Sequence, residues 1–369
     1  MRRYCIGLSA TQIGILIAMI PLFMLIFEIP TGAFADLYGR KFSVLLGYFL
    51  EGIGFLSLFF FTNYYALLGI FAFIGIGATF SSGSKEAWTT DLIKKKNKNL
   101  LHAFFVKEQS FQSFGLIISG IIGAIIVASL GLKYIWIFSF LAFLISIFIL
   151  SFTKEIFVEK KIKFNESYKN IKKQSKESII YSKKHPVLFY FLLANFIIVF
   201  AASFDEGLTW SPFLIELGFP DYGFGFLWSA INVAVMISPW LSHKFMKKGK
   251  ERKFIISIIL FSTIILSFVL FVQSYFLAVL ITILSLFFFS ARYPAERIFF
   301  HKFIPSKMRA TIGSVESMIL SIAAIIAMPL VGFAVDNLGA RYAIFLSVIL
   351  MIPGLIVYSI INEKEKKQT

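Results

Sequence analysis

Eleven long apolar runs follow one another along this chain of 369 residues and restrict the folds that are open to it. Each run has roughly 20 residues, which is the length of a helix that crosses the hydrocarbon core of a bilayer. The chain is 58% hydrophobic with a mean hydropathy of +0.82, beyond the usual range of soluble domains. The sequence therefore predicts an all-α polytopic membrane protein. The predicted spans are 13–35, 42–61, 64–84, 103–130, 134–152, 187–212, 222–241, 254–272, 275–295, 310–335 and 342–361.

The basic residues predict how these spans are oriented, because Lys and Arg are retained on the cytoplasmic side during insertion. If the turn between the first two spans is cytoplasmic, all but four of the 36 Lys and Arg residues fall on cytoplasmic ends or loops. The four exceptions are Arg2, Arg3, Lys133 and Arg341. We therefore expect a protein of the plasma membrane with a cytoplasmic C-terminus.

The start of the chain is unusual under this orientation. An odd number of spans places the N-terminus outside, so Arg2 and Arg3 precede a helix that enters from the outside. One more helix upstream would give twelve spans and two cytoplasmic termini. We therefore expect that the first helix is missing from this chain, and a natural eleven-helix protein is the alternative.

The net charge of +16 would suggest a nucleic-acid partner in a soluble protein. Here the basic residues gather on one side of a predicted membrane, so we expect a lipid bilayer and a small-molecule substrate as partners, and no nucleic acid. The lone Cys5 excludes an internal disulfide and a cysteine-rich metal site. The sequence has no HExxH or GxSxG motif and no phosphate-binding loop, so we expect no enzyme, cofactor or metal.

A hydrophilic segment, 153–185, separates five predicted spans from six. It predicts an N-terminal helical bundle over 1–152 and a C-terminal bundle over 186–369, joined by a basic linker. Phe164, Tyr168, Ile171 and Ile179 recur at helical spacing among lysines, which is typical of an amphipathic helix on the inner leaflet. A solvated charged linker is the alternative.

The turn between the first two spans resembles motif A of the major facilitator superfamily. The matching residues are Gly32, Asp36, Gly39, Arg40 and Lys41. The resemblance implies a two-bundle transporter fold of twelve helices, of which this chain would hold the second to the twelfth. A second copy of the motif would fall near 243–253, where Gly249 and Lys250 are present but no Asp is.

The resemblance also implies a gate on the cytoplasmic side. Asp91 follows the fourth family helix and would pair with Arg40. Asp36 would face the N-terminus of the helix that begins near Ala310, where exposed amides and the helix dipole favour a carboxylate. These contacts would hold the two bundles together at their cytoplasmic ends.

Three carboxyl groups are candidates for carrying a proton. Glu51 lies about 14 Å from Phe42 along its helix, near the middle of the bilayer. It could carry a proton or be a neutral packing group bonded to a neighbour. Asp205 and Glu206 lie about 28 Å from the inner end of the seventh family helix. They could attract cations or load protons, or simply cap the membrane surface.

Other charged and polar residues within the spans are candidates for the cavity or the gate. Charges in a membrane cost roughly 2.5 to 3.5 kcal/mol each on insertion scales, so each needs a reason. Glu296 lies four residues after one of them, Arg292, and could pair with it. The amides could bond a substrate or one another across helices, the latter being favoured. The candidates are Glu28, Glu86, Gln112, Asn195, Asn232, Arg292 and Glu316.

These features together predict a secondary transporter that moves a small solute by alternating access between two bundles. A proton gradient is the expected energy source. We expect a monomeric antiporter for efflux of amphipathic, drug-like compounds, with cations favoured because the outer charges are acidic. Proton-coupled uptake of a metabolite is the alternative, as is a non-transporting membrane sensor on the same scaffold.

Overall fold

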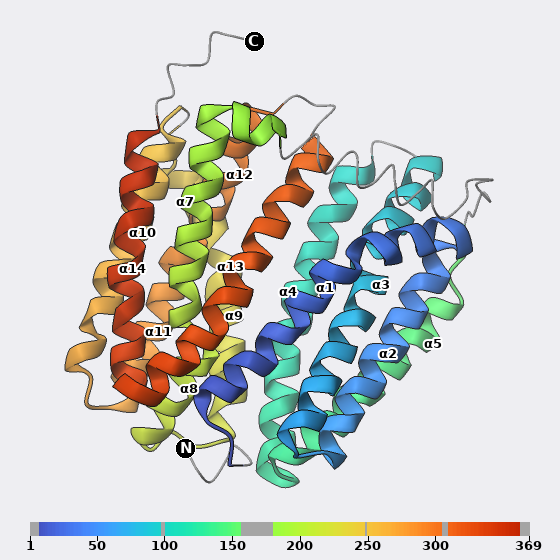
Figure 1. Ribbon diagram of the computed structural model, residues 1–369, viewed down its shortest axis with the longest axis horizontal. Helices are drawn as coiled ribbons and strands as arrows, with labels where there is room; N and C mark the ends of the chain where they lie inside the picture. The colour runs from blue at the N-terminus through green and yellow to red at the C-terminus, as the bar shows by residue number, and fades with distance from the viewer. Residues whose placement is uncertain (1–6, 97–99, 156–179, 248, 305–308, 362–369) are drawn as a thin grey trace. The chain divides into compact units, whose positions relative to one another are not determined.

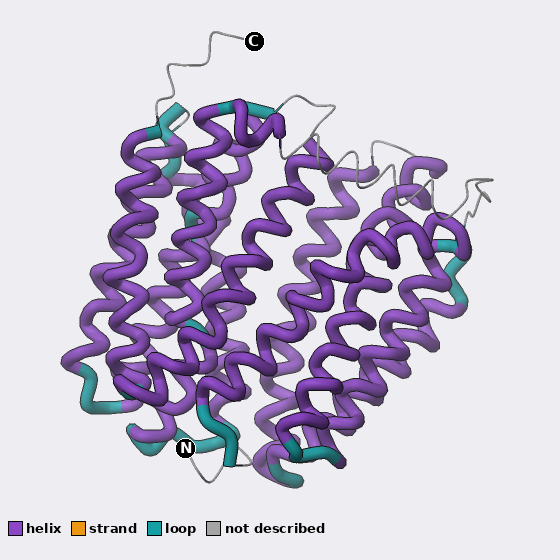
Figure 2. The backbone as a smooth tube through the Cα atoms, in the orientation of Figure 1, coloured by secondary structure: helices purple, strands orange, loops and turns teal. Residues whose placement is uncertain are grey.

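A computed structural model describes residues 7–96, 100–155, 180–247, 249–304 and 309–361 of the chain. Helices and short connections make up all of this described part, which contains no strand (Figure 2). The expected amphipathic helix over 164–179 lies outside the described residues.

Eleven helical stretches are long and apolar enough to cross a membrane in the part of the chain that is described, which confirms the predicted number. Two of these stretches are composite, because α8 continues α7 and α12 continues α11. The helices are α1 (Ala10–Tyr38), α2 (Arg40–Phe60), α3 (Tyr64–Lys96), α4 (Leu100–Ser129), α5 (Ile135–Ser151), α7 (Pro186–Ala202), α8 (Gly207–Glu216), α9 (Gly223–Phe245), α10 (Glu251–Ser267), α11 (Tyr275–Ser290), α12 (Tyr293–Lys302), α13 (Arg309–Leu338) and α14 (Ala340–Ile360) (Figure 1).

Local sequence explains where α7 begins and why it is separate from α8. Pro186 occupies its first turn, where a missing N–H costs nothing, and the ring of His185 accepts a hydrogen bond from the backbone N–H of Leu188 (3.4 Å). At the far end a 3-10 turn, Ser203–Asp205, is followed by extended backbone at Glu206 (φ −122°, ψ −173°). This break places Asp205 at a corner instead of on a helix face.

The described chain divides into two compact units. Unit 1 comprises Met1–Ile15, Leu116–Ala124 and Ser175–Thr369, and unit 2 comprises Leu16–Gly115 and Ile125–Gln174. In unit 2, α2 packs against both α3 and α5. In unit 1, α14 lies beside α7 and α10 (Figure 1).

Unit 1 contains a large apolar core, whereas α5 of unit 2 has no buried residue. The core is built around Phe191, Phe299 and Tyr358, each of which is 1% exposed or less. The sequence of α5, IWIFSFLAFLISIFILS, is apolar on every side. A helix that is apolar all round is either a buried helix or a membrane span, and because α5 is not buried its surface fits contact with lipid.

Candidate functional site

A polar pocket lies within unit 2 between α2, α3 and α4. Its volume is about 490 Å³, and small-molecule sites span roughly 300 to 1,000 Å³. Two of the predicted cavity or gate residues, Glu86 and Gln112, line it. An ion pair between Lys85 and Glu108 (3.2 Å) joins α3 to α4 at this pocket. The lining residues are Tyr48, Ser81, Ser82, Lys85, Glu86, Glu108, Gln109 and Gln112.

Glu51 is connected to this polar pocket by one hydrogen bond. The hydroxyl of Ser81, which lines the pocket, donates to Oε1 of Glu51 (3.0 Å). Two glycines make this contact possible, because a Cβ at Gly47 would stand 2.8 Å from the backbone N of Ser81, and one at Gly77 would stand 2.9 Å from that of Glu51. Close approach of α2 and α3 therefore brings the carboxyl group to the pocket wall.

The motif A turn makes its contacts at one end of unit 2. Arg40 forms an ion pair with Asp91, as the resemblance implies. The ammonium group of Lys41 donates to the carbonyl oxygens of Ser151 (2.7 Å) and Thr153 (2.8 Å). These carbonyl groups lie at the last residue of α5 and two residues beyond it, where no further turn of helix supplies a donor, so Lys41 ties the start of α2 to the end of α5.

The same turn has a further partner, Glu155, that the sequence did not suggest. Its Oε1 atom accepts from the backbone N–H groups of Arg40 (2.6 Å) and Lys41 (3.0 Å) and so caps the N-terminus of α2. Gly39 has a φ of +100°, and a Cβ there would stand 3.1 Å from Oε2 of Glu155. Gly39 thus both turns the chain and leaves room for the capping carboxylate. Gly32 and Asp36 are half-buried, and the predicted role of Asp36 at the helix near Ala310 stays a prediction.

A second turn with the same spacing lies in unit 1, between α13 and α14. Gly332, Asp336 and Gly339 have the spacing Gly-x-x-x-Asp-x-x-Gly of the motif A turn. The basic residue Arg341 follows them, as basic residues follow Gly39 in the motif A turn. Gly339 again has a positive φ, +85°. Arg341 donates to the carbonyl oxygens of Leu270 (3.0 Å) and Val272 (2.7 Å).

The two turns use their basic residue in the same way. In unit 1 the carbonyls at Leu270 and Val272 lie just beyond α10, which packs against α14. In unit 2 Lys41 binds the end of α5, which packs against α2. This turn is separate from the segment near 243–253, where the repeat of the motif stays a prediction. Arg341, an exception to the charge rule, has a structural reason for its position, because it binds the carbonyl groups of Leu270 and Val272.

The acidic residue of the second turn caps a helix. Asp336 accepts hydrogen bonds from the backbone N–H groups of Ala10 (2.9 Å) and Thr11 (2.8 Å) and from the Thr11 hydroxyl (2.6 Å). Close packing accompanies the cap, because a Cβ at Gly332 would stand 2.2 Å from the carbonyl oxygen of Ala10. The first turn of α1 is therefore fixed against the last turns of α13.

A buried ionic cluster lies in the core of unit 1. Arg292 donates to both carboxylate oxygens of Glu296 (2.6 and 2.5 Å), and the two residues are 3% and 8% exposed. The guanidinium also lies over the rings of Phe289 and Tyr293, at 4.0 and 4.7 Å from their centroids. The predicted pairing of Arg292 with Glu296 is confirmed, and the aromatic faces add further stabilisation of the buried cation.

Tyr358 extends this cluster to two more helices. Its hydroxyl lies 2.6 Å from Oδ1 of Asn195 and 3.3 Å from Oε1 of Glu296. The network thus joins α7, α12 and α14. Of the two roles predicted for Asn195, the structure shows the interhelical bond.

The remaining candidates fall in different settings. Glu316 is buried and pairs with the exposed Arg297 (2.7 Å). Asn232 donates to the carbonyl of Trp228 on its own helix (2.8 Å), and no bond joins it to Asn195. The side chain of Glu28 is exposed on α1.

The two neighbouring acids Asp205 and Glu206, both candidates for carrying a proton, have opposite environments. Asp205 is 6% exposed and accepts a hydrogen bond from the indole N–H of Trp210 (2.6 Å). Glu206 is exposed, in the extended break between α7 and α8. The 3-10 turn separates the two side chains, which adjacent positions in the sequence do not reveal.

Comparison with known proteins agrees with the helical fold and the motif A turn described above. The family model of the Major Facilitator Superfamily matches residues 5–289 and 240–369. The chain belongs to this superfamily. Its membership confirms the resemblance that motif A carried and makes the protein a multi-pass membrane transporter.

Two relatives and one solved structure extend this comparison of the superfamily member. A Bacillus subtilis (strain 168) protein named uncharacterized MFS-type transporter YxaM is 26% identical over 365 residues, which cover 95% of this chain and 87% of that protein. Multidrug resistance protein 2 of the same organism is 29% identical over 294 residues, which cover 74% of this chain and 67% of that protein. A crystal structure of the nucleoside transporter NupG superposes with a TM-score of 0.75 at 12% identity, over 97% of this chain and 92% of that one. At this identity the likeness to NupG is one of fold.

Proposed function

We propose that this superfamily member is a proton-coupled secondary transporter that exports amphipathic, drug-like compounds across the plasma membrane. It works as a monomer with its C-terminus in the cytoplasm, by alternating access. The relative named multidrug resistance protein 2 supports this substrate class.

The contact between Glu51 and Ser81 carries the proposal. A carboxyl group within a membrane helix is costly when ionised, so it needs a function or a partner. Among the described residues, Glu51 accepts a hydrogen bond from the Ser81 hydroxyl, and Ser81 lines the polar pocket. A proton released from Glu51 therefore has one hydrogen bond to cross to reach the pocket, where Lys85, Glu86 and Glu108 supply further polar groups.

The two glycine–aspartate turns support alternating access. Each places a carboxylate and a basic residue at the ends of neighbouring helices, where a change of state would make and break contacts. Ion pairs and helix caps of this kind contribute about 1 kcal/mol each, which suits a reversible contact.

Flux through proteoliposomes tests the proposal. The purified protein is reconstituted with ethidium or 8-anilinonaphthalene sulfonate as fluorescent probes, and a pH gradient is imposed. We expect the gradient to drive probe movement, and Glu51→Gln to reduce it at least about tenfold, as loss of a positioned proton-transfer group does. Glu216→Gln, an exposed carboxyl on α8, is the matched control and should transport normally. Movement that is unaffected by the gradient and by Glu51→Gln would overturn the proton coupling.

A further inference from the structure

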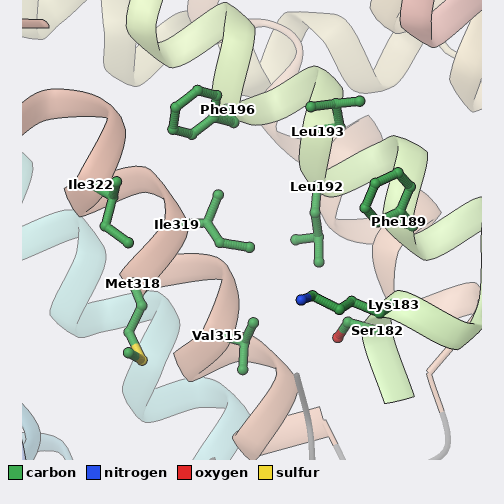
Figure 3. A pocket seen from close by; sticks show the side chains of 10 residues that line it. All are labelled: Ser182, Lys183, Phe189, Leu192, Leu193, Phe196, Val315, Met318, Ile319 and Ile322. Atoms are coloured by element: carbon green, nitrogen blue, oxygen red, sulfur yellow. The ribbon is translucent and has the colours of Figure 1, made fainter. Parts of the chain in front are cut away.

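A second cavity lies wholly within unit 1, between α7 and α13. Its volume is about 300 Å³. Apolar side chains from Phe189 to Phe196 on α7 and from Val315 to Ile322 on α13 form its walls (Figure 3). Each of these stretches covers seven steps of a helix, or about 10 Å. One leaflet of hydrocarbon is about 15 Å thick, so the cavity covers about two thirds of a leaflet and suits a single apolar chain.

Polar groups occur at one end of this cavity. Ser182 and Lys183 line it just before the start of α7, and the ammonium end of Lys183 points between the two helices (Figure 3). Lys183 makes no ion pair with any residue that the structure describes. An unpaired ammonium beside an apolar wall favours an anionic group on the occupant.

The second polar group is a buried hydroxyl. Ser182 is 4% exposed, and its Oγ atom has no hydrogen-bond partner in the described part of the chain. A buried hydroxyl without a partner loses its hydrogen bonds to water and gains none in return, so such groups are rare without a reason. A ligand oxygen between Ser182 and Lys183 would satisfy both.

We propose that this cavity binds a single-chain anionic amphiphile, with its acid group at Lys183 and Ser182 and its chain between α7 and α13. This inference rests on the proposed function and names the charge of its substrate class. It replaces the cationic preference expected from the sequence, because Asp205 is buried against Trp210 whereas Lys183 faces an apolar cavity. The site lies at the lysine-rich end of α7, the end proposed to be cytoplasmic, so it would load substrate from the inner side.

Photolabelling tests the site without requiring transport. A diazirine analogue of dodecanoate is applied to the protein in nanodiscs of phosphatidylcholine, and labelled peptides are identified by mass spectrometry. We expect labels on α7 and α13, displaced by dodecanoate and not by dodecyltrimethylammonium. Lys183→Gln should weaken competition by dodecanoate about three- to tenfold, as loss of a partly exposed charged contact does.

Three further arms define the outcome. Lys184→Gln, the exposed neighbour that does not line the cavity, should behave as wild type. Ile319→Trp should fill the cavity and abolish the labels, whatever the charge at position 183. Competition by lysophosphatidylglycerol stronger than by dodecanoate would identify the bilayer as the source of the anionic amphiphile; the reverse order would identify a free acid.

Equal competition by the cationic amphiphile, or labels that neither Lys183→Gln nor Ile319→Trp changes, would overturn the inference. Failure of the proposed function gives a different pattern. In that case dodecanoate binds with the expected dependence on Lys183, and proteoliposomes show no gradient-driven movement of it.

Discussion

Asp336 holds the first turn of α1 through two hydrogen bonds from Thr11. The backbone N–H and the hydroxyl of Thr11 both donate to Oδ2 of Asp336 (2.8 and 2.6 Å). The other carboxylate oxygen accepts from the backbone N–H of Ala10 (2.9 Å). The first N–H groups of a helix have no partner within it, and they form the positive end of its dipole. The Asp336 carboxylate on α13 therefore accepts from the free N–H groups at the start of α1 and also places a negative charge at the positive end of its dipole.

Replacing Asp336 by Asn should loosen this start of α1. The amide keeps the size but loses the charge, at a cost of about 1 kcal/mol, which is about a fivefold increase in the open population. Ala10 is fully buried, so Ala10→Cys in a Cys5→Ser background reports the opening through its alkylation rate. We expect that rate to rise about fivefold in Asp336→Asn. Asp221→Asn, the same change in a loop of unit 1, should leave it unchanged; equal rates in all three proteins would show that the cap does not hold α1.

Removing the hydroxyl of Ser81 should impair gradient-driven transport, because it leaves Glu51 without its partner. Loss of a hydrogen bond to a buried polar group costs about 1 to 3 kcal/mol, so we expect a reduction of about tenfold in Ser81→Ala. Ser82 also lines the polar pocket, but within the described part of the chain its hydroxyl donates to the carbonyl oxygen of Thr79 on its own helix (3.4 Å) and not to Glu51. Ser82→Ala is therefore the matched control in the same proteoliposome assay. A similar loss in both variants would point to the pocket wall in general and away from Glu51.

The features that the sequence predicted well are those set by local spacing. Runs of apolar residues give the eleven helices, because length and hydropathy alone decide what crosses a bilayer. The pair of Arg292 and Glu296 follows from their separation of four residues on one helix. The contact of Arg40 with Asp91 came from the resemblance to a known motif.

The features that sequence analysis missed depend on how helices far apart in the chain pack together. Tyr358 and Asn195 are 163 positions apart, and Asp336 and Thr11 are 325 apart. No periodicity links such residues, since their meeting is decided by close helix contacts such as that at Gly332. A signal for the second turn was present in the spacing of Gly332, Asp336 and Gly339, but a search confined to the loops predicted to be cytoplasmic passes over it.

Neutralising Glu296 should destabilise unit 1 far more than neutralising Glu316. Breaking a buried ion pair costs about 3 to 5 kcal/mol, because the remaining charge stays buried, and Arg292 is 3% exposed. The side chain of Arg297, the partner of Glu316, is 61% exposed. Loss of the ion pair between them should therefore lower the free energy of unfolding by about 1 kcal/mol or less. Thermal unfolding followed by tryptophan fluorescence in nanodiscs measures both. Equal losses for Glu296→Gln and Glu316→Gln would mean that the buried cluster adds no stability of its own.

Gly39→Ala should destabilise the protein, although replacing a glycine within a helix by alanine usually stabilises it. Its backbone, with φ +100° and ψ 143°, lies near a region that essentially only glycine adopts, and such a conformation costs an L-residue roughly 1 to 3 kcal/mol. The new Cβ would also press on Oε2 of Glu155, the residue that caps α2 through Arg40 and Lys41. Gly83→Ala is the control, because Gly83 lies within α3 with nothing within 4 Å of a Cβ, and there alanine should stabilise the helix by about 0.5 to 1 kcal/mol.

Unfolding midpoints of Gly39→Ala, Gly83→Ala and Glu155→Gln separate the two causes. Glu155→Gln keeps the glycine and weakens only the cap. If Gly39→Ala lowers the midpoint and Glu155→Gln lowers it less, backbone strain adds to the lost cap. If the two variants are equal and the double variant is no worse than either, the whole effect of Gly39 is to make room for Glu155. A Gly39→Ala protein as stable as Gly83→Ala would contradict both readings of this turn.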